Sequence, residues 1–166
     1  YNLYTFGLSS FPDYPKYSVW SDGYYITANK SGNNAFVMER DKMLSGDPSA
    51  QIIGFTIPSL STPGFFSVLP ATASSTLPAV GTPNYLFYFQ DDAWAGGVDH
   101  LKIWEVDVDW TTPSNSSIST PQSLNVTAFD SEFDASWNDI TQPGTNSKLD
   151  GVPGALMYMG HYRSFN

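Results

Sequence analysis

The chain has 166 residues, 16 of them acidic and 7 basic, so its formal net charge is −9. This length suits one ordinary core, and so acidic a chain lacks the Lys and Arg clusters that bind nucleic acid or anionic membranes. The absence of cysteine excludes disulfides, thiolate metal sites and cysteine nucleophiles, and no apolar run reaches the roughly 18 residues that would predict insertion into a membrane.

Aromatic and turn-forming residues predict the fold class. Aromatic residues make up 16% of the chain, and 13 Gly and 12 Pro are spread along it. Aromatic side chains favour strands, and many short strands need many turns. Strong helix signatures are missing, so the sequence predicts an all-β protein.

The first predicted strand is residues 1–6, and a loop over 7–16 follows it. A set of four short antiparallel strands is then predicted at 17–20, 24–29, 35–40 and 51–57. The Asp22-Gly23 pair between two aromatic β-runs is a strong hairpin signal, because both turn positions tolerate a positive φ.

A second set repeats this order, with a loop at 70–83. Its strands are predicted at 65–69, 84–89, 100–110 and 123–129. The strand predicted at 100–110 begins apolar on both faces, and from Trp104 to Trp110 its apolar side chains share one side while the acidic ones share the other. A third unit begins near residue 148 and includes a strand at 155–165.

Repeated units of four strands, with the variation confined to loops, are typical of β-propeller blades. We therefore expect consecutive four-stranded antiparallel blades of a β-propeller, incomplete in this chain; the alternative is a β-sandwich. The expected units are the end of a preceding blade at 1–16, blades at 17–60 and 64–130, and the start of a further blade at 148–166. A lone blade cannot bury both faces, so the remainder of the same polypeptide is an expected partner.

A resemblance begins at residues 11–27, which hold Asp-Tyr-Pro-Lys followed by Trp20, Asp22 and Tyr24-Tyr25. The chain resembles a group of uncharacterised secreted bacterial proteins with propeller-like repeats. The other matching segments are 41–48, 81–85, 101–105, 142–145, 148–150, 156–158 and 161–165. The resemblance implies a propeller fold, secretion and a longer polypeptide, but no established activity. Many members have cysteines near the segment matching 142–145, whereas residues 136–140 have none here, so any disulfide there is lost.

Glu105, Asp107 and Asp109 are the candidate metal ligands, with help from Asp91, Asp92 or Asp99 in the preceding loop. Ca²⁺ takes six to eight oxygen ligands, so it is the one cofactor that these carboxylates suggest; otherwise none is expected. Alternate side chains on a strand lie roughly 7 Å apart, which is wide for chelation. The alternative is an acidic, solvated strand that discourages edge pairing.

Five tryptophans are candidate platforms for stacking on sugars: Trp20, Trp94, Trp104, Trp110 and Trp137. Trp94, in the acidic Gly-rich loop 91–97, is the preferred ligand-binding residue, together with Asp91 and Asp92. Trp20 and Trp104 are instead expected to fill the space between blades.

Catalytic patterns are weak. Asp22 and Glu105 could form the carboxyl pair of a glycosidase, but a hairpin turn already explains Asp22. His100 and His161 lie at or in strands, and no Gly-x-Ser-x-Gly nucleophile elbow is present.

The expected function is a non-catalytic interaction or adhesion module of a secreted or cell-surface bacterial protein, with a glycan or a cell-surface protein as its partner. The alternative is an extracellular propeller glycoside hydrolase or another glycan-active enzyme. The expected location is extracellular or at the cell surface, and neither nucleic acid nor membrane insertion is expected.

Overall fold

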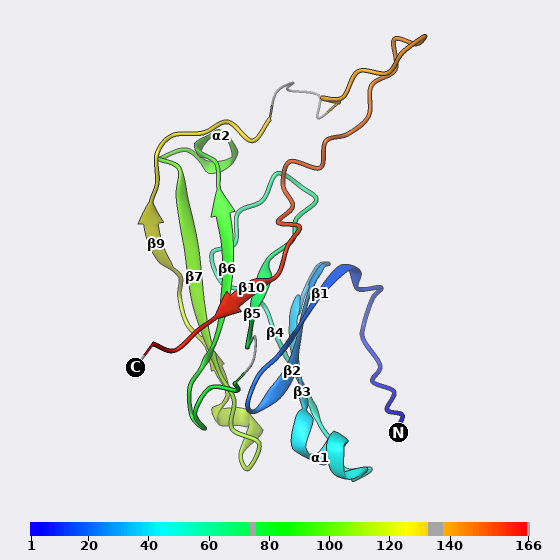
Figure 1. Ribbon diagram of the computed structural model, residues 1–166, viewed down its shortest axis with the longest axis vertical. Helices are drawn as coiled ribbons and strands as arrows, with labels where there is room; N and C mark the ends of the chain where they lie inside the picture. Colours follow the sequence, from blue (N-terminus) through cyan, green and yellow to red (C-terminus); the bar gives the residue numbers. More distant parts are fainter. Residues whose placement is uncertain (74–75, 133–137, 166) are drawn as a thin grey trace.

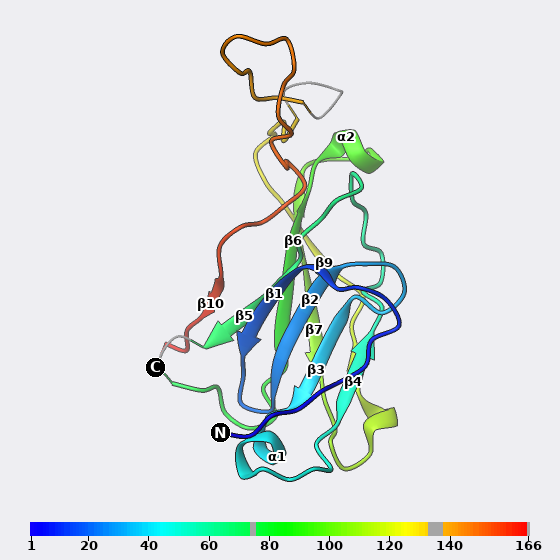
Figure 2. The same ribbon diagram turned by 90° about the vertical axis from the view of Figure 1, so that its right-hand side faces the viewer.

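The computed structural model describes residues 1–73, 76–132 and 138–165. Its strands form two sheets, and almost all pairing within each sheet is antiparallel, which confirms the all-β prediction. Figures 1 and 2 show the two sheets packed against each other, with the chain entering at the first sheet and leaving near β5. Within the described ranges neither sheet closes on itself.

The first sheet is a four-stranded antiparallel meander. It contains β1 (Asp13–Val19), β2 (Gly23–Asn29), β3 (Ala35–Glu39) and β4 (Ile52–Phe55), in chain order. The backbone N–H of Trp20 donates to the carbonyl of Gly23 over 3.0 Å and closes the predicted β1–β2 hairpin. Helix α1 (Arg40–Ser45) follows β3 and ends at Gly46, whose φ of 76° is the left-handed conformation that suits glycine.

The second sheet has the order β10-β5-β6-β7-β8, and β9 also pairs with β7. Its strands are β5 (Leu69–Ala73), β6 (Asn84–Gln90), β7 (His100–Asp107), β8 (Ser117–Ile118), β9 (Gln122–Asn125) and β10 (Gly160–Tyr162). Helix α2 (Asp92–Ala95) connects β6 to β7, and the short 3₁₀ helix η1 (Pro113–Asn115) precedes β8. Of the helices that the structure describes, none has the length and apolar character to cross a bilayer.

Three predicted strands need correction. Residues 1–6 pair with none of the strands that the structure describes; instead, the Asn2 amide donates to the carbonyl of Met43 and the Tyr4 hydroxyl to that of Asp47. Strand β5 starts at Leu69 and occupies part of the predicted 70–83 loop, because three of its residues pair with the distant β10. In the predicted strand 155–165 only β10 is a strand, while Ala155 makes a single parallel bridge to Ser67.

The core lies between the two sheets. The largest apolar side chains that are fully buried are Trp20, Tyr25, Val37, Val68, Leu86, Tyr88, Trp104 and Val106. Trp20 and Trp104 therefore fill the space between the two sheets. Each buried indole N–H needs an acceptor, and these reach carbonyls of connecting segments, Thr82 for Trp20 and Pro58 for Trp104, both over 2.9 Å.

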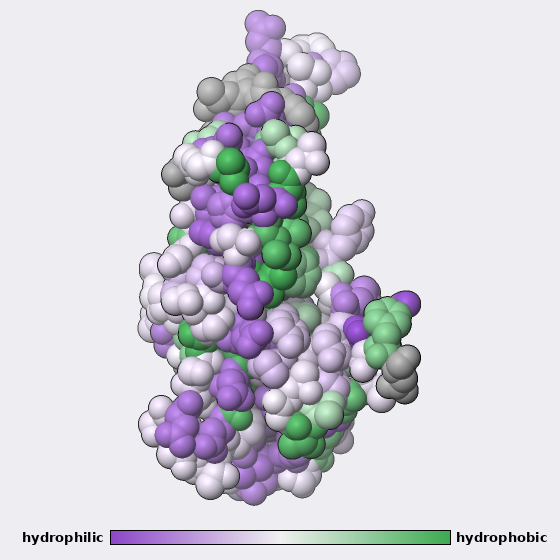
Figure 3. Space-filling model, turned by 90° about the vertical axis from the view of Figure 1, so that its left-hand side faces the viewer, coloured by the Kyte–Doolittle hydropathy of each residue, from purple (hydrophilic) through white to green (hydrophobic). Residues whose placement is uncertain are grey.

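The opposite face of the second sheet stays partly open. Leu101 on β7 and Leu124 on β9 are register partners and are 37% and 50% exposed. Figure 3 views the molecule from this side and shows hydrophobic residues gathered in a band beside hydrophilic ones. On the first sheet, Tyr17 and Val19 of β1 are likewise exposed.

Candidate functional site

A cavity of about 440 Å³ lies where turns of the two sheets meet. We call it the acidic cleft, because five carboxylates and one indole line it: Asp22, Glu39, Asp41, Asp107, Asp109 and Trp110. These residues come from the β1–β2 turn, the end of β3, the start of α1 and the segment that begins at the end of β7. The cleft therefore depends on both sheets being packed together.

Asp22 is the acid of the cleft whose pKa is raised. Burial raises the pKa of Asp22 above its ordinary 3.8, hydrogen bonds from Tyr25 and the backbone oppose this rise, and the negative charges of Asp107 and Asp41 add to it. The Tyr25 hydroxyl donates to both carboxylate oxygens of Asp22, over 3.1 and 3.2 Å. The Trp110 N–H donates to the backbone carbonyl of Asp22 over 2.8 Å, which ties the end of the second sheet to the hairpin of the first.

Two other acids of the cleft pair with cations. Glu39 contacts Lys42 over 3.2 Å and also accepts a hydrogen bond from the backbone N–H of Gln51. Asp41 contacts Arg40 over 3.2 Å.

Asp109 is held by its own loop. It accepts the backbone N–H groups of Thr112 and Thr111 over 2.8 and 2.9 Å and the Asn115 amide over 3.2 Å. The hydrogen bonds from Thr112 and Asn115 lower the pKa of Asp109. Asp22, Asp107 and Asp109 are thus the acids of the cleft that no salt bridge among the described residues neutralises, and of these Asp109 is held by hydrogen bonds from its own loop.

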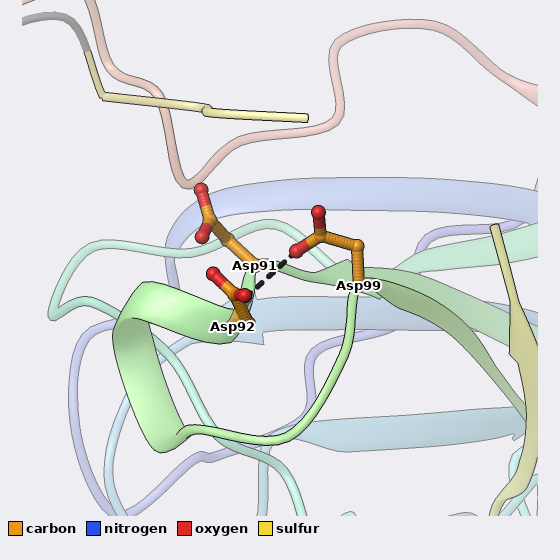
Figure 4. Close-up of side chains that lie close together, drawn as sticks. All are labelled: Asp91, Asp92 and Asp99. Atoms are coloured by element: carbon orange, nitrogen blue, oxygen red, sulfur yellow. Dashed lines mark hydrogen bonds between the residues drawn. The ribbon is translucent and has the colours of Figure 1, made fainter. Parts of the chain in front are cut away.

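A second acidic group lies at the other end of the second sheet, around α2 (Figure 4). Carboxylate oxygens of Asp91, Asp92 and Asp99 lie within 4.8 Å of one another. Within the described ranges this is the acidic group close enough to share one cation, and it does not include Glu105, Asp107 or Asp109.

The two buried members of this group already accept hydrogen bonds from the chain. Asp91 caps α2 through the N–H of Ala93 over 2.8 Å, and accepts both the backbone N–H and the hydroxyl of Ser131. Asp99 accepts the N–H of Asp92 over 2.8 Å and that of Phe129 over 2.6 Å. Burial alone would raise the pKa of Asp91, but the donors from Ser131 and Ala93 outweigh it and the pKa is lowered. These carboxylates hold loops together.

The remaining candidates lie apart. Trp94 packs its ring against Tyr88 and Phe89, with centroids 6.0 and 5.0 Å away, and its buried N–H has no hydrogen-bond partner among the described residues. His100 has Nδ1 2.6 Å from the carbonyl of Val98, and His161 lies exposed in β10. Trp137 lies outside the described residues.

The structure does not bring together the residues that the sequence suggested as one metal site. Asp107 and Asp109 line the acidic cleft, whereas Glu105 is absent from its lining. Trp110 was only one of five stacking candidates, and its place in the cleft was missed. The alternation of acidic and apolar residues in β7 continues to Asp109 and Trp110, and this pattern was the one in the sequence that could have indicated that these residues lie together.

Comparisons with known proteins give no relative: no family model, no curated protein and no solved structure matches this chain.

Proposed function

We propose that this chain is a non-catalytic, glycan-binding interaction module of a secreted or cell-surface bacterial protein, and that the acidic cleft is its binding site. The observation that carries this proposal is the position of the cleft, which turns from both sheets build together. Loops at one end of a rigid β scaffold are where binding residues gather.

The lining of the cleft suits a polyol ligand. Carboxylates accept hydrogen bonds from sugar hydroxyls, and an indole offers an apolar face on which a sugar ring can stack. Asp107 and Trp110 supply these two kinds of group on one wall. The net charge of −9 argues against a strongly anionic glycan, because like charges repel.

In this proposal the two sheets are consecutive blades of an incomplete propeller. Each has a meander of four strands in chain order, β1 to β4 and then β5, β6, β7 and β9. The first strands of successive blades lie side by side around a propeller's channel, and here β1 contacts β5 while β5 pairs in parallel with β10. The open faces with Leu101, Leu124, Tyr17 and Val19 would then pack against further blades.

The test is a glycan array probed with the full chain, run beside a hydrolysis screen on every glycan that binds. Asp107→Asn removes a carboxylate from the cleft, and Glu105→Gln is its matched control, two residues earlier on the same strand and outside the cleft lining. We expect binding without turnover, weakened by Asp107→Asn and kept by Glu105→Gln. Failure to bind any glycan, or equal binding by the two variants, would overturn the proposal.

One observation favours a second candidate, a glycoside hydrolase. A glycosidase needs one protonated and one ionised carboxyl, and the raised pKa of Asp22 beside Asp107 matches the first half of that need. Asp22 and Asp107 both line the acidic cleft, whereas Glu105 is not part of that lining. Turnover that Asp22→Asn and Asp107→Asn both abolish, with an acid limb in the pH–rate profile, would establish this candidate instead.

A further inference from the structure

The segment 152–165 lies against the body of the protein and contains the short strand β10. Gly160, His161 and Tyr162 pair in parallel with Ala71, Thr72 and Ala73 of β5. Earlier in the segment, the Tyr88 hydroxyl donates to the carbonyl of Gly154 over 2.6 Å and the Ser67 hydroxyl to that of Leu156 over 2.9 Å. The segment thus completes the second sheet at its β5 edge (Figure 1).

Two positions of the segment fit the surface below them closely. At Gly160 a Cβ atom would overlap the ring of Phe87, so the approach of the two chains requires glycine there. The ring of Tyr162 contacts both Trp20, with centroids 5.0 Å apart and planes at 70°, and Tyr85, with centroids 6.1 Å apart and planes at 10°. Both contacts are made with the body of the protein, not with neighbouring residues of the segment.

The part of the chain that delivers this segment has little contact with the sheets. Residues 138–150 are mostly exposed and lie away from the body in Figures 1 and 2. Their described β-pairing is a single antiparallel bridge within this stretch, between Ile140 and Leu149. The docking contacts of the segment therefore do not depend on which copy of the chain supplies it, which is the condition for strand exchange.

We propose that the β5 edge, with Trp20, Tyr85 and Phe87, is a strand-acceptor surface, and that its second occupant is the segment 152–165 of another copy of this chain. The acceptor recognises an extended, parallel strand with glycine opposite Phe87 and an aromatic residue two positions later. Main-chain pairing supplies the affinity and the two side-chain positions supply the selectivity, as in other β-augmentation contacts. The inference does not use the acidic cleft, so it stands or falls separately from glycan binding.

Engineered cysteines test the exchange directly, because the chain has none of its own. His161 and Thr72 are register partners, and strands about 5 Å apart bring such pairs within disulfide reach. One copy carries Thr72→Cys and the other His161→Cys; the two are mixed at high concentration and oxidised. In the control pair, the first copy carries Ser123→Cys instead of Thr72→Cys. Ser123 lies on β9 and is the register partner of Lys102, not of His161.

We expect a disulfide-linked dimer of Thr72→Cys with His161→Cys at about ten times the yield of the control pair, the ratio that corresponds to one well-made contact. A single chain with both cysteines should form its bond within the chain when dilute. Equal yields from the test pair and the control pair would overturn the proposal.

A second measurement is independent of the cysteine variants. In the full chain, Gly160→Val should expel its own segment from the acceptor surface. A fluorescent peptide with the natural sequence of 152–165 should then bind that variant about tenfold more tightly than the same peptide with Gly160→Val or Tyr162→Ala. Equal binding of the three peptides, or none, would overturn the proposal.

Discussion

The indole N–H of Trp104 donates a hydrogen bond to the carbonyl of Pro58 over 2.9 Å. This bond fastens the segment that links the two sheets onto the buried face of the second one. Trp104 is fully buried, so its ring fills the core between the sheets while its N–H provides the hydrogen bond that the Pro58 carbonyl needs.

Trp104→Phe should lower the free energy of unfolding by about 2 kcal/mol, from a small cavity and one carbonyl left without a donor. Urea denaturation followed by tryptophan fluorescence measures this loss. Trp94→Phe is the matched control, because the buried N–H of Trp94 has no hydrogen-bond partner among the described residues. Equal losses for the two variants would show that the bond to Pro58 contributes nothing.

Thr27→Val tests a contact between the two sheets. The Thr27 hydroxyl, on β2, donates to the carbonyl of Val68 just before β5 over 2.6 Å, in a buried position. Valine keeps the shape and removes the donor, so we expect a loss of about 1–2 kcal/mol in urea denaturation. Thr56→Val removes an exposed hydroxyl bond to Asn33 and should stay within about 0.5 kcal/mol of the wild type.

Asp22 should contribute to the pH dependence of the free energy of unfolding. Its folded pKa is raised above 3.8, so its contribution is fully present below the unfolded pKa and is lost as pH rises through the folded pKa. Wild type should therefore lose stability relative to Asp22→Asn as pH rises through that window, in urea denaturation at a series of pH values. Wild type should instead gain stability relative to Asp47→Asn as pH rises, because hydrogen bonds from Ser49 lower the pKa of Asp47. A difference between wild type and Asp22→Asn that does not change with pH would contradict this assignment.

Asp91→Asn should destabilise the protein by about 1–3 kcal/mol at neutral pH, because the amide cannot accept the donors from Ala93 and Ser131 as a carboxylate does. The folded pKa of Asp91 is lowered, so its stabilising effect is present above the unfolded pKa and fades as pH falls through the folded one. Thermal unfolding at neutral and acidic pH compares this variant with Asp92→Asn, its exposed neighbour. Similar shifts in the two variants, or a shift for Asp91→Asn that persists in acid, would argue against the role of Asp91.

The sequence predicted the local features of the fold well. The aromatic run at 84–89 forms β6, and most of the predicted strand at 100–110 forms β7. Asp22-Gly23 forms the turn of a hairpin. Each of these signals lies within a few residues of chain, where side-chain periodicity and turn chemistry act directly.

The acidic cleft could not be predicted in the same way. Asp22 lies in the β1–β2 turn, Asp41 in the first turn of α1 and Asp107 at the end of β7, and the packing of one sheet on the other brings them together. The turn explanation for Asp22 was correct for the backbone, but it did not predict that the residue also lines the acidic cleft. The predicted position of β5 was wrong for a related reason. Its parallel partner β10 lies far along the chain, and no local pattern in the sequence indicates that pairing.

Asp99 has a consequence for the motions of the protein. One of its oxygens holds the N–H of Asp92 at the start of α2, and the other holds the N–H of Phe129 beyond β9. Releasing either segment would admit water to the buried Asp99 carboxylate, and a hydrated carboxylate loses less when its other donor leaves, so opening one segment makes opening the other easier. The amide protons of Asp92 and Phe129 should therefore exchange with deuterium together, as one cooperative unit rather than as two frayed loops.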